Sequence, residues 1–190
     1  MNKRKWIAAG VFVFLVAIFL FFNWQYPYSF ISVKKSIEFT PDIKMAEGVT
    51  MDLQSLHHFY AKNPAESEDL TANRTEYILD IFDEEGLSSK KTVKMDDRQM
   101  TDYLTFNQRA RTLLLELAFR EKYTKETKEY LKMAVENNIE IETALLKVKN
   151  DPTITRGRAE SYLHEAYMMM QNQVDYYQSF YESYIRAGKN

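Results

Sequence analysis

The chain has 190 residues, of which 45% are hydrophobic and 27% are charged, and it contains no cysteine. This composition excludes a fully disordered chain and allows one folded domain with a short appendage. Without disulfides, the fold must be held together by its core alone. The formal net charge of −2 lacks the strong basic excess of nucleic-acid-binding proteins, so we expect no nucleic-acid partner.

The chain opens with a basic stretch and a long apolar segment. Residues 1–5 include three basic side chains, and the run Trp6–Phe22 that follows carries no charge. Such a run approaches the length needed to cross the hydrocarbon core of a bilayer. Bulky residues follow it where signal peptidase needs small ones, so an uncleaved signal anchor over 6–26 is favoured over a cleaved signal peptide.

The positions of the basic residues predict the topology. Basic residues remain on the cytoplasmic side of a membrane, so we expect residues 1–5 in the cytoplasm and the C-terminal part outside the cell membrane. A cysteine-free exported domain with no targeting signal except its anchor is typical of a Gram-positive bacterial surface protein. We therefore expect a single-pass membrane protein with an extracytoplasmic domain over residues 49–190.

Prolines and glycines divide the region after the anchor. Residues 27–48 are interpreted either as a juxtamembrane stalk or as a segment lying at the membrane interface. Two shorter helices are predicted over 50–62, capped by Thr50, and over 73–86. Each has apolar residues spaced three and four apart, which indicates one buried face.

Three longer helices follow, with the same spacing of apolar residues. They are predicted from about 96 to 122, from a cap at Thr124 to about 150, and from about 155 to 187. Short polar connections between long helices are typical of an antiparallel bundle. We therefore expect an all-α protein in which the two shorter helices, placed end to end, form a broken fourth column beside the three long helices.

Two asparagines lie at interior positions of the first two long helices. Asn107 and Asn138 are at similar distances from the turn that joins these helices, so we expect them at one level of the bundle. They could form a buried polar pair that fixes the register, or they could belong to a ligand site. The register interpretation is the simpler one. Gln173 is farther from its own turn and need not join them.

The residues that usually carry chemistry do not form a recognisable constellation. His57 and His58 are adjacent, so their side chains diverge on a helix. Glu160 and His164 share a helix face, but a dinuclear carboxylate site would need a second motif of this kind. Phosphate-binding loops, hydrolase elbows and zinc motifs are also missing. We expect no catalytic residue, metal or cofactor, and therefore a non-enzymatic protein.

The stretch "YYQSFYESYI", residues 176–185, has more aromatic surface than one helix seam can bury. Part of it could pack against the shorter helices, and part could face a partner, because tyrosine tolerates both water and apolar neighbours. The expected interface comprises the following residues: Tyr176, Tyr177, Tyr181, Tyr184 and Ile185.

These observations favour a membrane-anchored extracytoplasmic interaction module, a scaffold or accessory subunit of a cell-envelope assembly. Its expected partners are the lipid bilayer, through residues 6–26, and another membrane or envelope protein or a second copy, through the C-terminal helix. The alternative is a domain that binds or senses a small ligand and signals through a partner. The layout resembles the four-helix ligand-binding modules of bacterial chemoreceptors, which also follow a membrane span, and this resemblance is one of architecture.

Overall fold

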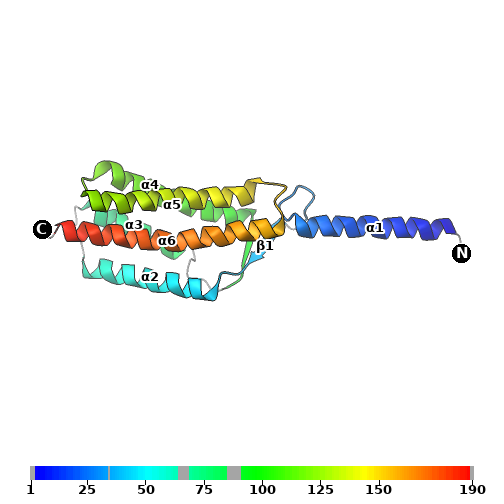
Figure 1. The fold of residues 1–190 in the computed structure, drawn as a ribbon, viewed down its shortest axis with the longest axis horizontal. Coiled ribbons are helices and arrows are strands. Elements are labelled where there is room, and N and C mark those ends of the chain that lie inside the picture. Colours follow the sequence, from blue (N-terminus) through cyan, green and yellow to red (C-terminus); the bar gives the residue numbers. More distant parts are fainter. Residues whose placement is uncertain (1–2, 34, 64–68, 85–90, 189–190) are drawn as a thin grey trace.

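The computed structural model describes residues 3–33, 35–63, 69–84 and 91–188. Helices dominate it (Figure 1), which confirms the expected helical class. A short antiparallel sheet that the sequence did not predict is also present. The elements in chain order are α1 (Lys3–Gln25), β1 (Ser36–Phe39), α2 (Ile43–Lys62), α3 (Leu70–Glu84), β2 (Val93–Asp96), α4 (Asp97–Arg120), α5 (Lys125–Asn150) and α6 (Arg156–Gly188).

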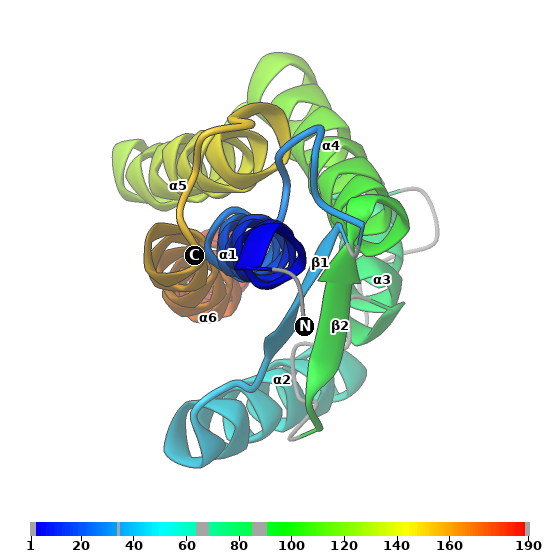
Figure 2. The same cartoon turned by 90° about the vertical axis from the view of Figure 1, so that its right-hand side faces the viewer.

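Helices α2 to α6 lie side by side along a common axis, as Figures 1 and 2 show. Helix α5 packs between α4 and α6, whereas α2 packs on α6 and α3 packs on α4. The sheet lies at the end of the bundle from which α1 projects (Figure 2). The core therefore runs through the bundle from the sheet to the far end, where α6 finishes.

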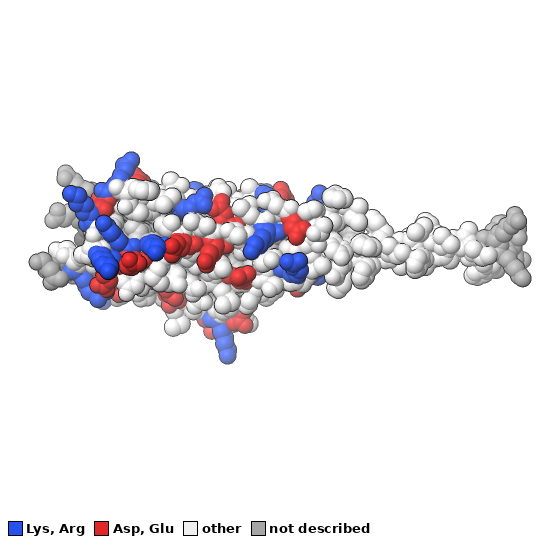
Figure 3. All heavy atoms as spheres, turned by 45° about the horizontal axis from the view of Figure 1, so that its top comes forward, with Lys and Arg blue, Asp and Glu red and all other residues white. Residues whose placement is uncertain are grey.

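Helix α1 stands apart from this core. The segment Trp6–Gln25 has a mean hydropathy of 2.4, and none of it is buried. Among the described residues, this segment of α1 is the one helix that is long and apolar enough to cross a membrane. Figure 3 shows that its described surface carries no charged side chain.

The shorter helices α2 and α3 do not form one broken column. They lie side by side, since the His57 ring on α2 contacts Asp83 on α3 at 3.1 Å and the Tyr60 hydroxyl reaches the Ala72 carbonyl at 3.4 Å. Helix α2 ends at Lys62, and the backbone N–H of its C-cap Asn63 donates to the Phe59 and Tyr60 carbonyls. Our expectation that these two helices together form one broken fourth column is therefore wrong, because the described residues place α2 and α3 beside each other and not end to end.

The segment 27–48, expected to be a stalk or an interfacial segment, belongs largely to the folded domain. Strand β1 pairs with β2 so that Ile37 lies opposite Met95, and the Ile37 side chain is only 1% exposed. The Tyr28 hydroxyl donates to the Met95 carbonyl at 2.7 Å. Because the pairing partner lies more than fifty residues away, local periodicity could not reveal this strand.

Helix α2 begins earlier than expected. Asp42 is its N-cap, and its carboxylate accepts hydrogen bonds from the backbone of Lys44 and Met45. Thr50, the expected cap, lies inside the helix and donates to the Ala46 carbonyl at 2.7 Å. Gly48 is also internal, and a Cβ there would lie 2.8 Å from the Gln171 amide nitrogen. Because that atom is the end of a flexible side chain, the contact does not require glycine, and Gly48 does not mark a helix end.

Candidate functional site

The expected interface on α6 is the first site to locate in the fold. Tyr177 and Tyr181 are both 0% exposed, so neither ring can contact a partner while the bundle is folded. These two residues are therefore withdrawn from the interface. Tyr176, Tyr184 and Ile185 are partly buried. The two rings are covered because α2 and α3 form two columns, and these bury more of α6 than a single column would.

The hydroxyl groups of five tyrosines, three of them on α6, converge on the end of α2 and the start of α3. Each of the five forms a hydrogen bond with Asn63 or with a residue of 69–75. The pairs are Tyr177 with Thr75 Oγ1 (2.8 Å), Tyr123 with Thr71 Oγ1 (2.8 Å), Tyr184 with Asp69 Oδ2 (2.5 Å), Tyr181 with the Asn63 carbonyl (3.2 Å) and Tyr60 with the Ala72 carbonyl (3.4 Å). Buried tyrosine hydroxyls require such partners.

The rings in this region pack edge to face. Tyr177 meets Phe82 of α3 with ring centroids 6.1 Å apart, and Phe180 meets Tyr123 at 5.3 Å, both near perpendicular. Tyr181 meets Phe59 of α2 in the same geometry at 6.0 Å. The stretch 176–185 thus joins the end of α6 to α2, α3 and the α4–α5 connection. Its aromatic excess is chiefly structural.

The environment of these hydroxyls opposes ionisation. Burial raises the pKa of Tyr123, Tyr177, Tyr181 and Tyr184 above the ordinary tyrosine value. For Tyr184, the hydrogen bond to the Asp69 carboxylate and its negative charge raise the pKa further. These groups therefore stay protonated at neutral pH, and we assign them no acid–base role.

The structure brings the two interior asparagines together. The Asn107 amide donates to the backbone carbonyl of Asn138 at 2.9 Å, which links α4 to α5. The neighbouring Asn137, which sequence analysis did not single out, donates to Gln173 Oε1 and to the Met169 carbonyl, each at 2.8 Å. Gln173 thus pairs with Asn137, the neighbour of Asn138 in the chain, and not with Asn107 or Asn138 themselves. We call Asn107, Asn137, Asn138 and Gln173 the amide cluster.

Some polar atoms of this cluster have no partner. Both amide atoms of Asn138 and the Nε2 atom of Gln173 are buried without a hydrogen bond to the described protein atoms. Buried amides of this kind normally bind an internal water molecule or another polar group.

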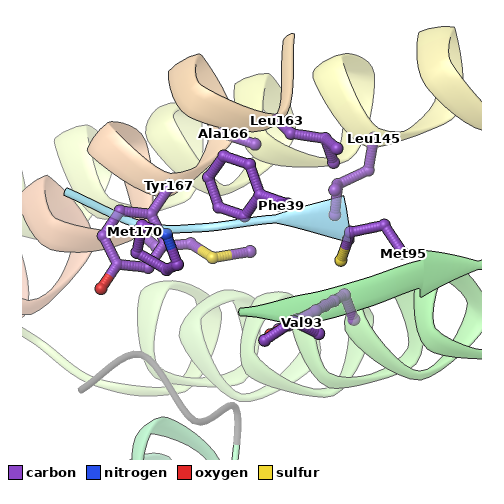
Figure 4. Close-up of a pocket in the computed structure, with 10 residues that line it drawn as sticks. Phe39, Val93, Met95, Leu145, Leu163, Ala166, Tyr167 and Met170 are labelled. Atoms are coloured by element: carbon purple, nitrogen blue, oxygen red, sulfur yellow. The ribbon is translucent and has the colours of Figure 1, made fainter. Parts of the chain in front are cut away.

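An apolar cavity lies next to the sheet (Figure 4). Phe39 and Val93 line it from the sheet, and Leu145, Leu163 and Met170 line it from α5 and α6. Its volume is about 20 Å³, room for a single water molecule, whereas small-molecule sites usually enclose about 300–1,000 Å³. The cavity is therefore a packing gap beneath the strands in this conformation.

A groove on the surface lies between α5 and α6. It holds about 590 Å³ and is open to solvent. Its lining combines apolar, aromatic and polar residues: Asn137, Glu140, His164, Glu165, Met168, Met169, Asn172 and Tyr176. Met168 is 48% exposed. We call this surface the α5–α6 groove. Figure 3 shows the side of the molecule that carries α5, with acidic side chains along the middle of the domain.

The histidines do not assemble a metal centre. His164 lines the α5–α6 groove, whereas His57 and His58 lie on α2. Within the described ranges, no group of three or more histidine or acidic side chains is arranged to hold an ion.

Comparison of the chain with protein-family models, with curated proteins and with solved structures finds no match. Of the expected interface residues, Tyr176 lines the α5–α6 groove, together with Met168 and Met169. Three methionines are consecutive in the sequence at 168–170, and the structure separates them: Met168 is exposed in the groove, whereas Met170 is buried in the core.

Proposed function

We propose that the protein is a membrane-anchored, non-enzymatic interaction module of the cell envelope. Helix α1 crosses the membrane, and the bundle offers the α5–α6 groove to a helical segment of another membrane or envelope protein. The observation that carries this proposal is the groove itself, which is open to solvent between α5 and α6 and is lined by the exposed Met168 and the partly buried Tyr176.

The chemistry of the groove suits a helix. Methionine adapts its shape to different apolar partners, and tyrosine contributes contact area that tolerates water. Amphipathic helices bind such grooves through apolar residues on one face. Glu140 and Glu165 on the groove walls favour a partner helix that carries basic residues beside its apolar face.

The proposal also includes the orientation of the chain in the membrane, with its start in the cytoplasm. The apolar, unburied surface of α1 supports a membrane span, and the three basic residues that precede Trp6 support a cytoplasmic start of the chain. The bundle then lies outside the cytoplasm. A cysteine-free chain suits an envelope domain that does not depend on disulfide formation.

Photo-crosslinking in native membranes tests the groove. A benzophenone amino acid replaces Met168 or Tyr176 in separate variants, and Met51 of α2 is the control position because it is exposed but lies outside the groove. We expect discrete adducts from the two groove positions and not from Met51. In a second variant, Met168→Glu should reduce the adduct from Tyr176 several-fold without changing the melting temperature.

The products distinguish the possible occupants. An adduct in which mass spectrometry identifies a helical segment of another membrane protein supports the proposal. An adduct with a second copy of this chain would replace it with self-association. Equal labelling from Met51, or no adduct from either groove position, would contradict it.

A second candidate function is the binding of a small polar ligand within the bundle. The unpartnered atoms of Asn138 and Gln173 favour it. Because the described cavities near the core are small, such a ligand would have to open the bundle. The test is a thermal shift with pooled small polar metabolites. A rise in melting temperature for the wild type that disappears in Asn138→Leu would support this function.

A further inference from the structure

Hydrogen bonds and a cation–π contact join the end of α1 to the bundle and to the turn that follows α1. Arg156, the first residue of α6, donates from Nε to the Trp24 carbonyl at 3.2 Å, and its guanidinium carbon lies 5.8 Å from the centroid of the Trp24 ring. The Asn23 side-chain oxygen accepts hydrogen bonds from the Ser32 hydroxyl and the Val33 backbone at 3.2 and 3.1 Å. These contacts fix the end of α1 relative to the domain.

The segment after α1 is a structured turn with an outward-facing apolar surface. Pro27, Ser29 and Ser32 are buried, and backbone hydrogen bonds close the turn from Ser29 to Tyr26 and from Ser32 to Ser29. Phe30 and Val33, in contrast, are 84% and 77% exposed.

Trp24 is 59% exposed and Ile31 is 50% exposed. A cluster of large apolar side chains in water is unfavourable, so this surface needs a cover. We call Trp24, Phe30, Ile31 and Val33 the basal patch.

Cationic side chains lie beside the basal patch. An open groove of about 1180 Å³ separates α1 from the base of the bundle, with Phe19, Leu20 and Val33 on its walls. Its basic residues are Lys35, Lys94, Arg98 and Arg156, and its acidic residues are Glu38, Asp96 and Asp97.

Two of the acids are already engaged. Asp96 caps α4 and contacts Lys94 at 3.5 Å, and Asp97 contacts Lys149 at 3.7 Å. Within the described part of the chain, Lys35 and Arg98 form no ion pair shorter than 4.0 Å, which leaves their charges available for an anionic group.

We infer that the basal patch is a second membrane contact, in which Phe30, Ile31 and Val33 enter the interface of the leaflet reached by the end of α1. This inference rests on the proposed crossing of the membrane by α1. The occupant is lipid because the patch is continuous with the apolar surface of α1: the turn is bonded to Asn23, two residues before α1 ends. Lys35 and Arg98 then lie at the level of the lipid phosphates.

This contact orients the whole domain. Helix α1 extends along the long axis of the bundle (Figure 1), and the segment that follows it flanks its base (Figure 2). With both the helix and the turn held by the bilayer, the bundle stands upright on the membrane. The α5–α6 groove then runs along the membrane normal, the direction in which a membrane-spanning partner helix would leave the bilayer.

Site-directed spin labelling tests the contact, and the absence of native cysteines makes each label unambiguous. Full-length Phe30→Cys and Val33→Cys variants are labelled with a nitroxide in nanodiscs of phosphatidylcholine and phosphatidylglycerol. Met51→Cys and Ile139→Cys, which are exposed on the sides of the bundle, report the aqueous limit, and Phe14→Cys in α1 reports the bilayer. Accessibility to oxygen and to a water-soluble nickel complex is measured for each.

We expect the ratio of oxygen to nickel accessibility at positions 30 and 33 to be several times that at Met51→Cys and to approach that at Phe14→Cys. Equal ratios at 30, 33 and 51 would overturn the inference. Shielding from both reagents would also overturn it, because a protein partner or a second copy would then cover the patch. A lipid-like value at position 14 with aqueous values at 30 and 33 leaves the α1 anchor intact, whereas an aqueous value at 14 refutes the anchor and this inference together.

Discussion

Tyr184 and Asp69 are joined by a hydrogen bond of 2.5 Å from the tyrosine hydroxyl to the carboxylate oxygen Oδ2. The other carboxylate oxygen accepts from the Thr71 backbone N–H at 2.8 Å, so the same side chain serves the first turn of α3. One carboxylate therefore stabilises the start of α3 and ties it to the end of α6. Tyr184 is therefore held in place by Asp69 although it lies near the end of α6.

Replacing Asp69 tests this double role. Asp69→Ala removes both the cap and the acceptor, and we expect the free energy of unfolding to fall by about 1–3 kcal/mol. Tyr184→Phe removes only the hydrogen bond and should cost about 1 kcal/mol. Urea unfolding followed by circular dichroism measures both. The double variant should lose less than the sum of the single losses, and simple additivity would show that the two residues are not coupled.

Two adjacent tyrosines should differ sharply in their effect on stability. Tyr177→Ala removes a fully buried ring that contacts Phe82 and Thr75, and we expect a loss of about 3–5 kcal/mol in the free energy of unfolding. Tyr176→Ala is the matched control, because its ring is only partly buried, and it should cost about 1 kcal/mol or less. Equal losses for the two variants would contradict the assignment of Tyr177 to the core.

Stability should decline at alkaline pH. A tyrosine whose pKa is raised by folding keeps its proton in the folded state at a pH where the unfolded chain has lost it. The contribution of Tyr123, Tyr177 and Tyr181 is therefore complete below about pH 10, the ordinary tyrosine pKa, and is lost as the pH rises above it. Urea midpoints measured between about pH 8 and pH 11 should fall only in the upper part of that range. A midpoint that does not change with pH would refute this prediction.

The amide cluster allows a comparison of neighbouring residues. Asn138→Leu removes amide atoms that have no partner, while the backbone carbonyl that accepts from Asn107 remains. We expect its stability to be unchanged or higher, because an unsatisfied buried amide costs free energy. Asn137→Leu breaks two hydrogen bonds and should be destabilised by about 1–3 kcal/mol. Urea unfolding measures the stability of the two variants. If Asn138→Leu were the less stable of the two, Asn138 would hold an internal water or ligand.

Local signals in the sequence were sufficient for much of the fold. Apolar residues spaced three and four apart predicted the long helices, and Thr124 was recognised as the cap of α5, where it accepts from the Thr127 N–H at 3.2 Å. The meeting of Asn107 with Asn138 followed from their equal distances to one turn. These inferences succeed because helix period, capping and short turns are set by residues close together in the chain.

The remaining features depended on contacts between distant residues. Ile37 lies opposite Met95 in the sheet, and four residues of strand pattern could not reveal that pairing. The sequence predicted that the first short helix begins after a cap at Thr50, whereas α2 begins at Ile43 and includes Gly48.

The stretch 176–185 illustrates the division most clearly. The sequence by itself determined that α6 is a helix with more aromatic surface than one neighbour can cover. Only the tertiary structure decided which rings are covered, since α2 and α3 form two columns around Tyr177 and Tyr181 and leave Tyr176 beside the α5–α6 groove. The physical reason is that burial depends on which helices pack together, and that choice is a sum over many long-range contacts that no local pattern encodes.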